Sequence, residues 1–318
     1  MSQGHVAEAQ TGMAEVSADP RFAKPRALCY VVGGQKCGTT WLNRYFLAHP
    51  EIHLSTGREL SYWSRRSGEA SQKEAARLRK RLKRDPFYMR LTRPKRYRLL
   101  HLFQRMHEAE ASDHTRYADL MFHGYRGEAV VADVSPAYAS LGRSDFREIA
   151  RLNDQVRFIF VMRDPVDRLH SAFRHYLRKR SGYEHVTEAD VVAHLKRELA
   201  GEIELALPSS RYDLTIGELE AAVAKDQILY LFYETLFSAE KLTEICDFLG
   251  VGAVPGRTEE HVNEGWSTGK AIDAEFEALA MAKLLPVYDE IANRWGGDLP
   301  AGWRRPGRQT PEPLRGIA

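Results

Sequence analysis

The chain has 318 residues, of which 43% are hydrophobic and 10% are aromatic, so it can bury a large core in one α/β domain or in two smaller ones. Its three cysteines, Cys29, Cys37 and Cys246, cannot form a full disulfide framework, which indicates a reducing compartment. No uninterrupted apolar span of about 18 residues occurs, so a transmembrane helix is not expected.

Residues 1–24 are expected to form a loose tail. It is polar and rich in alanine, and it lacks the apolar core after a basic start that a secretory signal peptide has. We therefore expect a soluble cytoplasmic protein. The proline-rich end, residues 301–318, is also expected to be loose, which leaves residues 25–300 as one folded domain.

Residues 28–42, LCYVVGGQKCGTTWL, have the pattern of a buried strand, a glycine-rich loop and the start of a helix. A bound phosphate needs backbone N–H groups that converge on it and the positive end of a helix dipole. The residues that can supply close backbone approach, hydroxyls and charge here are Gly33, Gly34, Lys36, Gly38, Thr39 and Thr40. A strand-to-helix connection that only turns the chain is the alternative.

The position of Lys36 separates this loop from the P-loop of nucleoside triphosphatases. In G-x-x-x-x-G-K-[ST] the lysine follows the second glycine, and the next hydroxyl holds magnesium. Here Lys36 precedes Gly38, and Thr39 follows that glycine. This order disfavours a P-loop kinase or nucleotidase, which we keep as the alternative function together with a non-catalytic nucleotide-binding relative.

Four apolar runs predict the strands of a parallel sheet, because helical stretches separate them. They are residues 28–32, 129–132, 157–162 and 228–233. We expect the α/β class, as a single domain with a central parallel sheet flanked by helices and a P-loop-like strand-loop-helix. Ligands of such sheets gather beyond the carboxyl ends of the strands, where the glycine-rich loop and Asp133 would lie.

Residues 158–173, FIFVMRDPVDRLHSAF, predict a second anion-binding element. Asp164 and Pro165 have the order of a helix cap followed by a first-turn proline, so Arg163 ends a strand and Ser171 lies two turns into the next helix. An arginine fork and a hydroxyl that converge there suit a terminal phosphate. The alternative is that Arg163 pairs with Asp167 at the helix start.

Residues 65–105 form a strongly basic helical segment. Fifteen lysines and arginines stand against three acids, so this segment carries +12 while the whole chain carries +3. A solvated helical face is the simplest interpretation. The alternatives are a contact surface for an acidic acceptor or a peripheral contact with an anionic membrane. Nucleic acid is not expected, because no recognised module is present.

The separate pieces resemble the sulfotransferases that use 3′-phosphoadenosine 5′-phosphosulfate (PAPS), and they fit the bacterial and Golgi carbohydrate branch best. The resemblance is carried by QKCGTTWL at residues 35–42, by Ala48-His49-Pro50, by Arg58-Glu59-Leu60-Ser61-Tyr62-Trp63 and by the arginine-headed motif at residues 158–173. It covers about residues 26–300. It implies transfer of a sulfuryl group from PAPS to a hydroxyl of a saccharide, lipid or small metabolite, with PAP as the product.

The resemblance also implies roles for individual residues. Lys36 would stabilise the leaving phosphate, and Glu59 would act as the general base, unless it is a surface glutamate paired with Arg58 or Arg65. Arg163 and Ser171 would hold the 3′-phosphate. The residues expected to bind the rest of the donor are Gln35, Lys36, Cys37, Gly38, Thr39, Thr40 and Trp41, the last through adenine stacking.

Three further positions complete the predicted site. Asp133, in VVADVSPAY, is the alternative base, although Val134 stands where relatives often have lysine. Lys270 follows a glycine in a late loop and is a candidate phosphate contact, although the family's Lys-Gly-Arg signature is absent. No metal site is predicted, because the histidines and cysteines lack zinc-ligand spacing.

Overall fold

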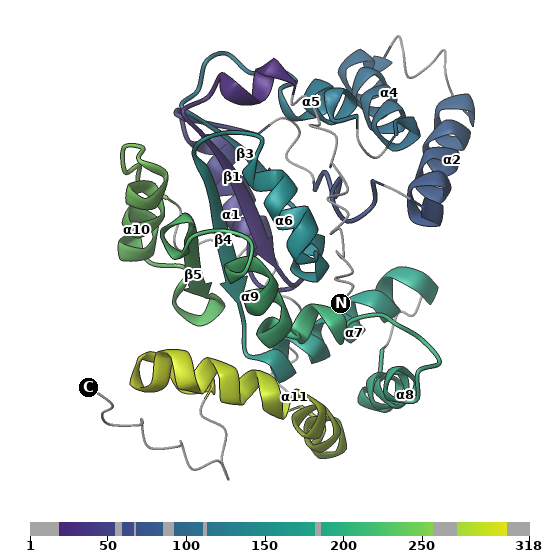
Figure 1. Cartoon of the computed structure of the whole chain (residues 1–318). Helices are drawn as coiled ribbons and strands as arrows, with labels where there is room; N and C mark the ends of the chain where they lie inside the picture. The colour runs from purple at the N-terminus through teal and green to yellow at the C-terminus, as the bar shows by residue number, and fades with distance from the viewer. Residues whose placement is uncertain are drawn as a thin grey trace, which may run out of the picture.

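The computed structural model describes residues 19–54, 59–66, 68–84, 92–110, 113–181, 186–256 and 272–303. A five-stranded sheet with the strand order β2-β3-β1-β4-β5 lies at its centre, and all neighbouring strands run parallel. Helices flank this sheet (Figure 1). The predicted fold class, a single α/β domain with a central parallel sheet, is confirmed.

The four predicted strands are all present. They are β1 (Ala27–Gly33), β3 (Val130–Val134), β4 (Val156–Met162) and β5 (Ile228–Phe232). Their ends differ from the predicted ones by at most two residues, because each strand is an apolar run whose burial on the sheet is evident in the sequence. The edge strand β2 (Ile52–His53) was not predicted, since two residues give no readable pattern.

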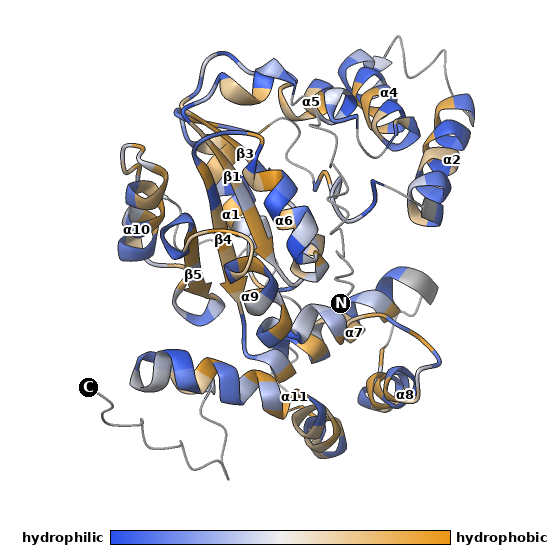
Figure 2. Cartoon of the chain, in the orientation of Figure 1, coloured by the Kyte–Doolittle hydropathy of each residue, from blue (hydrophilic) through white to orange (hydrophobic). Residues whose placement is uncertain are grey.

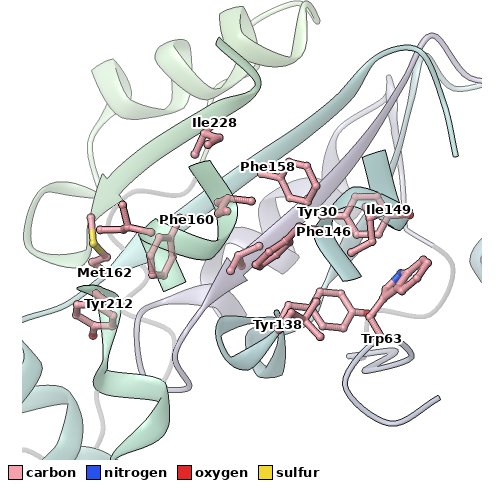
Figure 3. Packing of buried hydrophobic residues seen from close by; sticks show 14 of the residues in the cluster. Tyr30, Trp63, Tyr138, Phe146, Ile149, Phe158, Phe160, Met162, Tyr212 and Ile228 are labelled. Carbon is pink, nitrogen blue, oxygen red and sulfur yellow. The ribbon is translucent and has the colours of Figure 1, made fainter. Parts of the chain in front are cut away.

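Alternate residues of β1 point to opposite faces of the sheet, and each face has its own core. Leu28, Tyr30 and Val32 belong to the larger cluster of buried side chains, whereas Cys29 and Val31 belong to the smaller one. The larger cluster is rich in aromatic rings, among them Phe158 and Phe160 of β4 (Figure 3). Burial of β1 on both faces accounts for its continuous apolar sequence.

The helices divide between these two cores. The smaller core is covered by α1 (Thr39–Ala48) and α10 (Ala239–Leu249). The larger core receives side chains from α5 (Thr115–Met121), α6 (Arg143–Ala150), α7 (Pro165–Ser181), α8 (Glu188–Leu199), α9 (Tyr212–Glu220) and α11 (Ala274–Trp295). The apolar residues of α11 are spaced so that they share one side of the helix. Its Phe276, Leu284 and Tyr288 are buried in the larger core. Among the described residues, none of the helices is both long and apolar enough to cross a membrane.

Short 3-10 turns connect the main elements. They are η1 (Pro20–Ala23), η2 (Pro136–Ser140), η3 (Pro208–Ser210), η4 (Lys225–Gln227), η5 (Tyr233–Thr235), η6 (Gly296–Asp298) and η7 (Ala301–Trp303). The three cysteines are free and buried.

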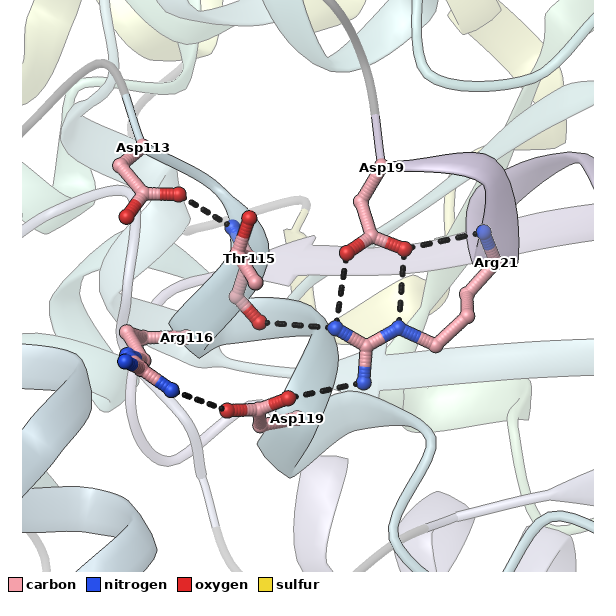
Figure 4. A network of polar contacts seen from close by, with 6 residues as sticks. All are labelled: Asp19, Arg21, Asp113, Thr115, Arg116 and Asp119. Atoms are coloured by element: carbon pink, nitrogen blue, oxygen red, sulfur yellow. Dashed lines mark hydrogen bonds and ion pairs between the residues drawn. The ribbon is translucent and has the colours of Figure 1, made fainter.

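The start of the described chain is fixed to the domain by Arg21. Its guanidinium contacts Asp19 at 2.7 Å, Asp119 of α5 at 2.9 Å and the Thr115 carbonyl oxygen at 3.1 Å (Figure 4). Phe22 beside it is fully buried. Residues 1–18 of the predicted tail lie outside the described residues, and so do residues 304–318 at the other end.

The described residues of the basic segment include the helices α2 (Gly68–Arg84) and α4 (Pro94–Glu108), which pack against each other. We call this pair the basic hairpin. Leu78, Leu82 and Leu100 form a small separate core between the helices. Both helices project from the side of the domain at which α5 lies, and their remaining surface is largely hydrophilic (Figures 1 and 2).

Candidate active site

The glycine-rich loop follows β1 and leads directly into α1. Gly38 is the amino-terminal cap of α1 and has a φ of 84°, a left-handed conformation that glycine adopts without strain. Lys36 has a φ of 78°, which is uncommon for a residue with a Cβ atom. No side chain caps the first turn of α1, so the Thr39 and Thr40 amides there are available to an anion, together with the helix dipole.

The predicted donor-binding residues of this loop lie in different environments. Gln35 and Thr40 are exposed and Lys36 is half-buried, whereas Cys37 and Thr39 are buried. The Cys37 sulfur lies 3.7 Å from the Tyr212 hydroxyl, so its side chain faces the interior. Cys37 can therefore offer its main chain to a ligand, and not its thiol.

Trp41 is 4% exposed and is accounted for by packing. Its ring stacks on Tyr45, with 6.3 Å between centroids, and meets the edge of Phe237 at 5.1 Å. The adenine contact of Trp41 stays a prediction.

The arginine-headed motif meets the glycine-rich loop. Arg163 follows β4, which is the direct neighbour of β1 in the sheet, and its Nη1 donates to the Lys36 carbonyl oxygen at 3.3 Å. Its guanidinium also lies over the Tyr233 ring, 4.7 Å from the centroid. The Tyr212 hydroxyl donates to the Arg163 carbonyl oxygen at 3.0 Å and fixes the main chain there. The two predicted anion-binding elements therefore form one site.

Helix α7 carries basic groups that lie within electrostatic range of Lys36. Ser171, His175 and Arg178 are spaced by four and three residues, so they lie along the same side of α7. Burial lowers the pKa of Lys36, and the charges of Arg163 and Arg178 lower it further. Burial also lowers the pKa of His175, with added repulsion from Lys36, Lys179 and Arg178. These basic groups repel one another in the free protein, and a bound anion would relieve that repulsion.

His175, Arg178 and Lys179 were missed by sequence reasoning. Their spacing from Ser171 along one predicted helix was the available signal, but it could not tell that His175 and Arg178 lie within electrostatic range of Lys36. By contrast, His170 contacts Glu188 on α8, with 2.6 Å between Nε2 and Oε2, and therefore has a partner outside the site.

Glu59 lies in the segment between β2 and α2. Its side chain is exposed, yet desolvation by the surrounding protein raises its pKa, and Asp133 adds to this effect while Arg65 and Lys179 oppose it. Because the charge of Lys179 acts on Glu59, the two side chains lie within electrostatic range of each other. The predicted partner Arg58 lies outside the described residues, and so does Lys270.

Asp133 is fully buried at the end of β3. Its carboxylate accepts hydrogen bonds from the hydroxyls of Tyr117 at 2.8 Å, Tyr138 at 2.6 Å and Ser135 at 2.5 Å. Burial raises the pKa of Asp133, and these hydrogen bonds oppose the rise. With its oxygens occupied and no surface exposed, Asp133 is suited to positioning other groups better than to accepting a proton from a substrate.

Asp133 connects to the segment that carries Glu59. The Ser135 oxygen that donates to Asp133 also accepts from the Ser61 amide at 2.9 Å. Ser61 has a φ of 51°, a left-handed conformation that this hydrogen bond helps to hold. Glu59 is two residues away, so the chain Asp133, Ser135 and Ser61 fixes the backbone next to the predicted base.

Among the described residues, no group of three or more histidine, cysteine, aspartate or glutamate side chains is placed to hold a metal ion. The described site is instead rich in cations around a helix amino terminus, an arrangement that can bind a phosphate or sulfate ester.

Comparison with known proteins agrees with this chemistry. The profile of the Sulfotransferase family matches residues 29–255, which include both anion-binding elements. A search of curated proteins found no match.

Among solved structures, a sulfotransferase from Alicyclobacillus acidocaldarius is similar, with a TM-score of 0.60 and 20% identity over 89% of this chain and 100% of that one. The sulfotransferase domain of the Synechococcus PCC 7002 olefin synthase is 19% identical, with a TM-score of 0.46, over 82% of this chain and 95% of that one. The first likeness supports the fold, and the family profile covers more than half of the sequence. The chain belongs to the sulfotransferase family.

Proposed function

We propose that this sulfotransferase uses PAPS as its donor and transfers the sulfuryl group to an acceptor hydroxyl, releasing PAP. One observation carries the proposal: the Arg163 guanidinium lies 3.3 Å from the Lys36 carbonyl oxygen. The elements expected to bind the two phosphate-bearing ends of PAPS are thus neighbours at the carboxyl edge of the sheet, the usual ligand position in such folds.

The proposed donor contacts divide between the two elements. The first turn of α1 offers amides and its dipole to the 5′-phosphosulfate, and Lys36 adds a positive charge. Arg163 and Ser171 would hold the 3′-phosphate, since a guanidinium and a hydroxyl both donate to its oxygens. Arg178 extends the positive surface along α7, and His175, whose pKa is lowered, can donate a ring N–H.

The proposed chemistry is an in-line displacement at sulfur. The acceptor oxygen forms a bond to sulfur while the bond from sulfur to the bridging phosphate oxygen breaks. Glu59 takes the hydroxyl proton, and Lys36 stabilises the negative charge that develops on the departing phosphate. The raised pKa of Glu59 makes its carboxylate a stronger base than an ordinary glutamate.

The acceptor side is formed in part by the basic hairpin, and we propose that the acceptor is anionic. Several exposed basic residues of α2 and α4 have no acidic partner among the described residues: Lys80, Lys83, Lys95, Arg96, Arg98 and Arg105. Such a surface attracts an acidic saccharide or an anionic lipid through the same charges.

The donor assignment is tested with labelled PAPS and the Lys36→Ala variant. Wild-type protein should transfer the label to an acceptor in a cell extract, identified by mass spectrometry. The variant should lose about 10² to 10³ in kcat, because one preorganised donor to a developing oxyanion is worth about 3 to 4 kcal/mol.

Lys225→Ala serves as the control, because Lys225 is an exposed lysine in η4. It should retain full activity. Magnesium-dependent ATP turnover, with no sulfuryl transfer from PAPS, would instead favour the kinase alternative.

A further inference from the structure

Arg168 is a fully enclosed charge. It lies in the first turns of α7 and is 1% exposed. A guanidinium is protonated at all physiological pH values, and its burial without an anionic partner is costly. Burial this complete therefore needs a compensating interaction.

The hydrogen bonds of Arg168 all go to neutral acceptors. Nε and Nη2 donate to the Ser210 hydroxyl at 2.8 and 2.6 Å, Nη2 also donates to the Ala206 carbonyl oxygen, and Nη1 donates to the Gln35 carbonyl oxygen at 3.2 Å. These four bonds use four of the five N–H groups, and none of them brings an anion into direct contact with the guanidinium.

None of the acidic side chains in the described ranges forms an ion pair with Arg168. Asp164, one helical turn away, uses its two carboxylate oxygens to accept from the Asp167 amide at 2.9 Å and the Tyr288 hydroxyl at 2.8 Å.

A buried carboxylate, that of Glu198, lies across one peptide group from Arg168: it accepts from the Leu207 amide at 3.0 Å, and the Ala206 carbonyl oxygen of the same peptide accepts from Arg168. Glu198 therefore balances the charge of Arg168 from that side through the backbone.

The loop that receives the donor lies directly over Arg168. A Cβ atom added to Gly34 would come within 2.8 Å of Arg168 Cδ, so glycine at this position lets the loop rest on the arginine. The Gln35 carbonyl accepts from Arg168, and the next carbonyl, that of Lys36, accepts from Arg163. Two arginines therefore hold successive carbonyls of the loop, including the left-handed turn at Lys36.

We propose that Arg168 is a positioning residue for the 5′-phosphate end of the donor, which would bind on the other side of the loop. The inference rests on the proposed function. Arg168 turns the Gln35 carbonyl toward itself, which orients the following amide away from it, and its charge attracts the anion through one layer of backbone. The donor would thereby add a second anion near Arg168, beside the one that Glu198 supplies within the fold.

Calorimetric titration with PAP and AMP tests this role, since AMP carries the 5′-phosphate alone. Arg168→Gln removes the charge and should weaken both ligands by about tenfold or more. Arg168→Lys keeps the charge and should bind both within about threefold of wild type. Arg163→Ala should weaken PAP and spare AMP, because its proposed target is the 3′-phosphate.

Arg174→Gln is the matched control, since it removes an arginine from α7 that pairs with Glu188. It should bind both nucleotides like wild type. Binding of both ligands by Arg168→Gln within twofold of wild type would overturn the inference and leave Arg168 a purely structural residue. If Arg168→Gln does not fold, Arg168→Lys decides, and a tenfold loss in that variant contradicts the role of the charge.

Failure of the donor assignment is a separate outcome. If wild-type protein binds neither nucleotide, the proposed function is wrong, and inorganic pyrophosphate becomes the probe of the loop. Arg168→Gln should then bind pyrophosphate about tenfold more weakly than wild type if the charge of Arg168 supports anion binding. Equal affinity of the two proteins for pyrophosphate would contradict the inference.

Discussion

Glu59 is the proposed general base, and its surroundings change its pKa in the direction that this role needs. It reaches solvent, and its pKa is raised chiefly by desolvation, with the charge of Asp133 as a lesser cause. Asp133, considered from the sequence as an alternative base, is enclosed by the hydroxyls of Tyr117, Ser135 and Tyr138. The difference between these two acids depends on their surroundings and could not be derived from their sequence positions.

Glu59→Gln should lower kcat by about 10² to 10⁴ and leave the PAP dissociation constant within twofold of wild type. The active form is the carboxylate, so wild-type kcat/KM should fall as the pH drops through the raised pKa of Glu59. This acidic limb should be absent in the variant. Steady-state kinetics across pH and PAP titration check both parts. An unchanged kcat in the variant would show that Glu59 is not the base and that a group of the substrate itself accepts the proton.

The segment carrying Glu59 is held by a neighbouring element, the turn η2 after β3. Ser135→Ala would leave the buried Ser61 amide without its acceptor and should cost about 1 to 3 kcal/mol in unfolding free energy. We expect kcat to fall as well, because Ser61 fixes the backbone two residues from Glu59. Urea denaturation and kinetics measure the two effects.

Ser140→Ala provides the comparison from the same turn, since its hydroxyl donates to the Ala137 carbonyl oxygen at an exposed position. It should change neither quantity appreciably. A Ser135→Ala variant that is less stable but retains full kcat would show that the hydrogen-bond chain supports the fold and not the base.

The basic hairpin is the element on which acceptor recognition is expected to depend. Lys80 and Lys83 are three residues apart on the exposed side of α2, so reversing both charges should weaken binding of an acidic oligosaccharide by about tenfold and reduce its salt dependence. Lys225→Glu is the control for a change of net charge.

Anionic vesicles form the second arm of the same experiment, at low and high salt. Binding to vesicles with no binding to oligosaccharides would assign the hairpin to a membrane surface. Binding to neither would leave it a solvated face, with acceptor choice made elsewhere.

At the scale of the whole molecule, the donor should stabilise the fold, because its proposed contacts join β1, α1 and α7. PAP at one hundred times its dissociation constant should add about 2.7 kcal/mol to the unfolding free energy. Thermal denaturation with and without PAP measures the gain. At the same PAP concentration, Arg163→Ala should show a smaller gain, and an equal gain would remove Arg163 from the donor site.

Local sequence patterns were sufficient to predict the strands and to locate the two elements that we propose to bind anions. A buried parallel strand needs a continuous apolar run. A phosphate loop needs glycines, a cation and a helix start. Each of these patterns lies within one short stretch of sequence and can be recognised there. Strand β2 was not predicted because it has only two residues, which form no recognisable pattern. It exists because it pairs with β3.

The sequence by itself therefore determined the fold class and the family, and it supplied the residues of the proposed anion site. The tertiary structure decided which residues meet. Arg163 reaches Lys36 across 127 positions because β4 lies beside β1, and Arg168 meets Gln35 and Ser210 because three distant segments close around it. Such contacts depend on strand order and burial, which are properties of the whole chain and leave no local pattern.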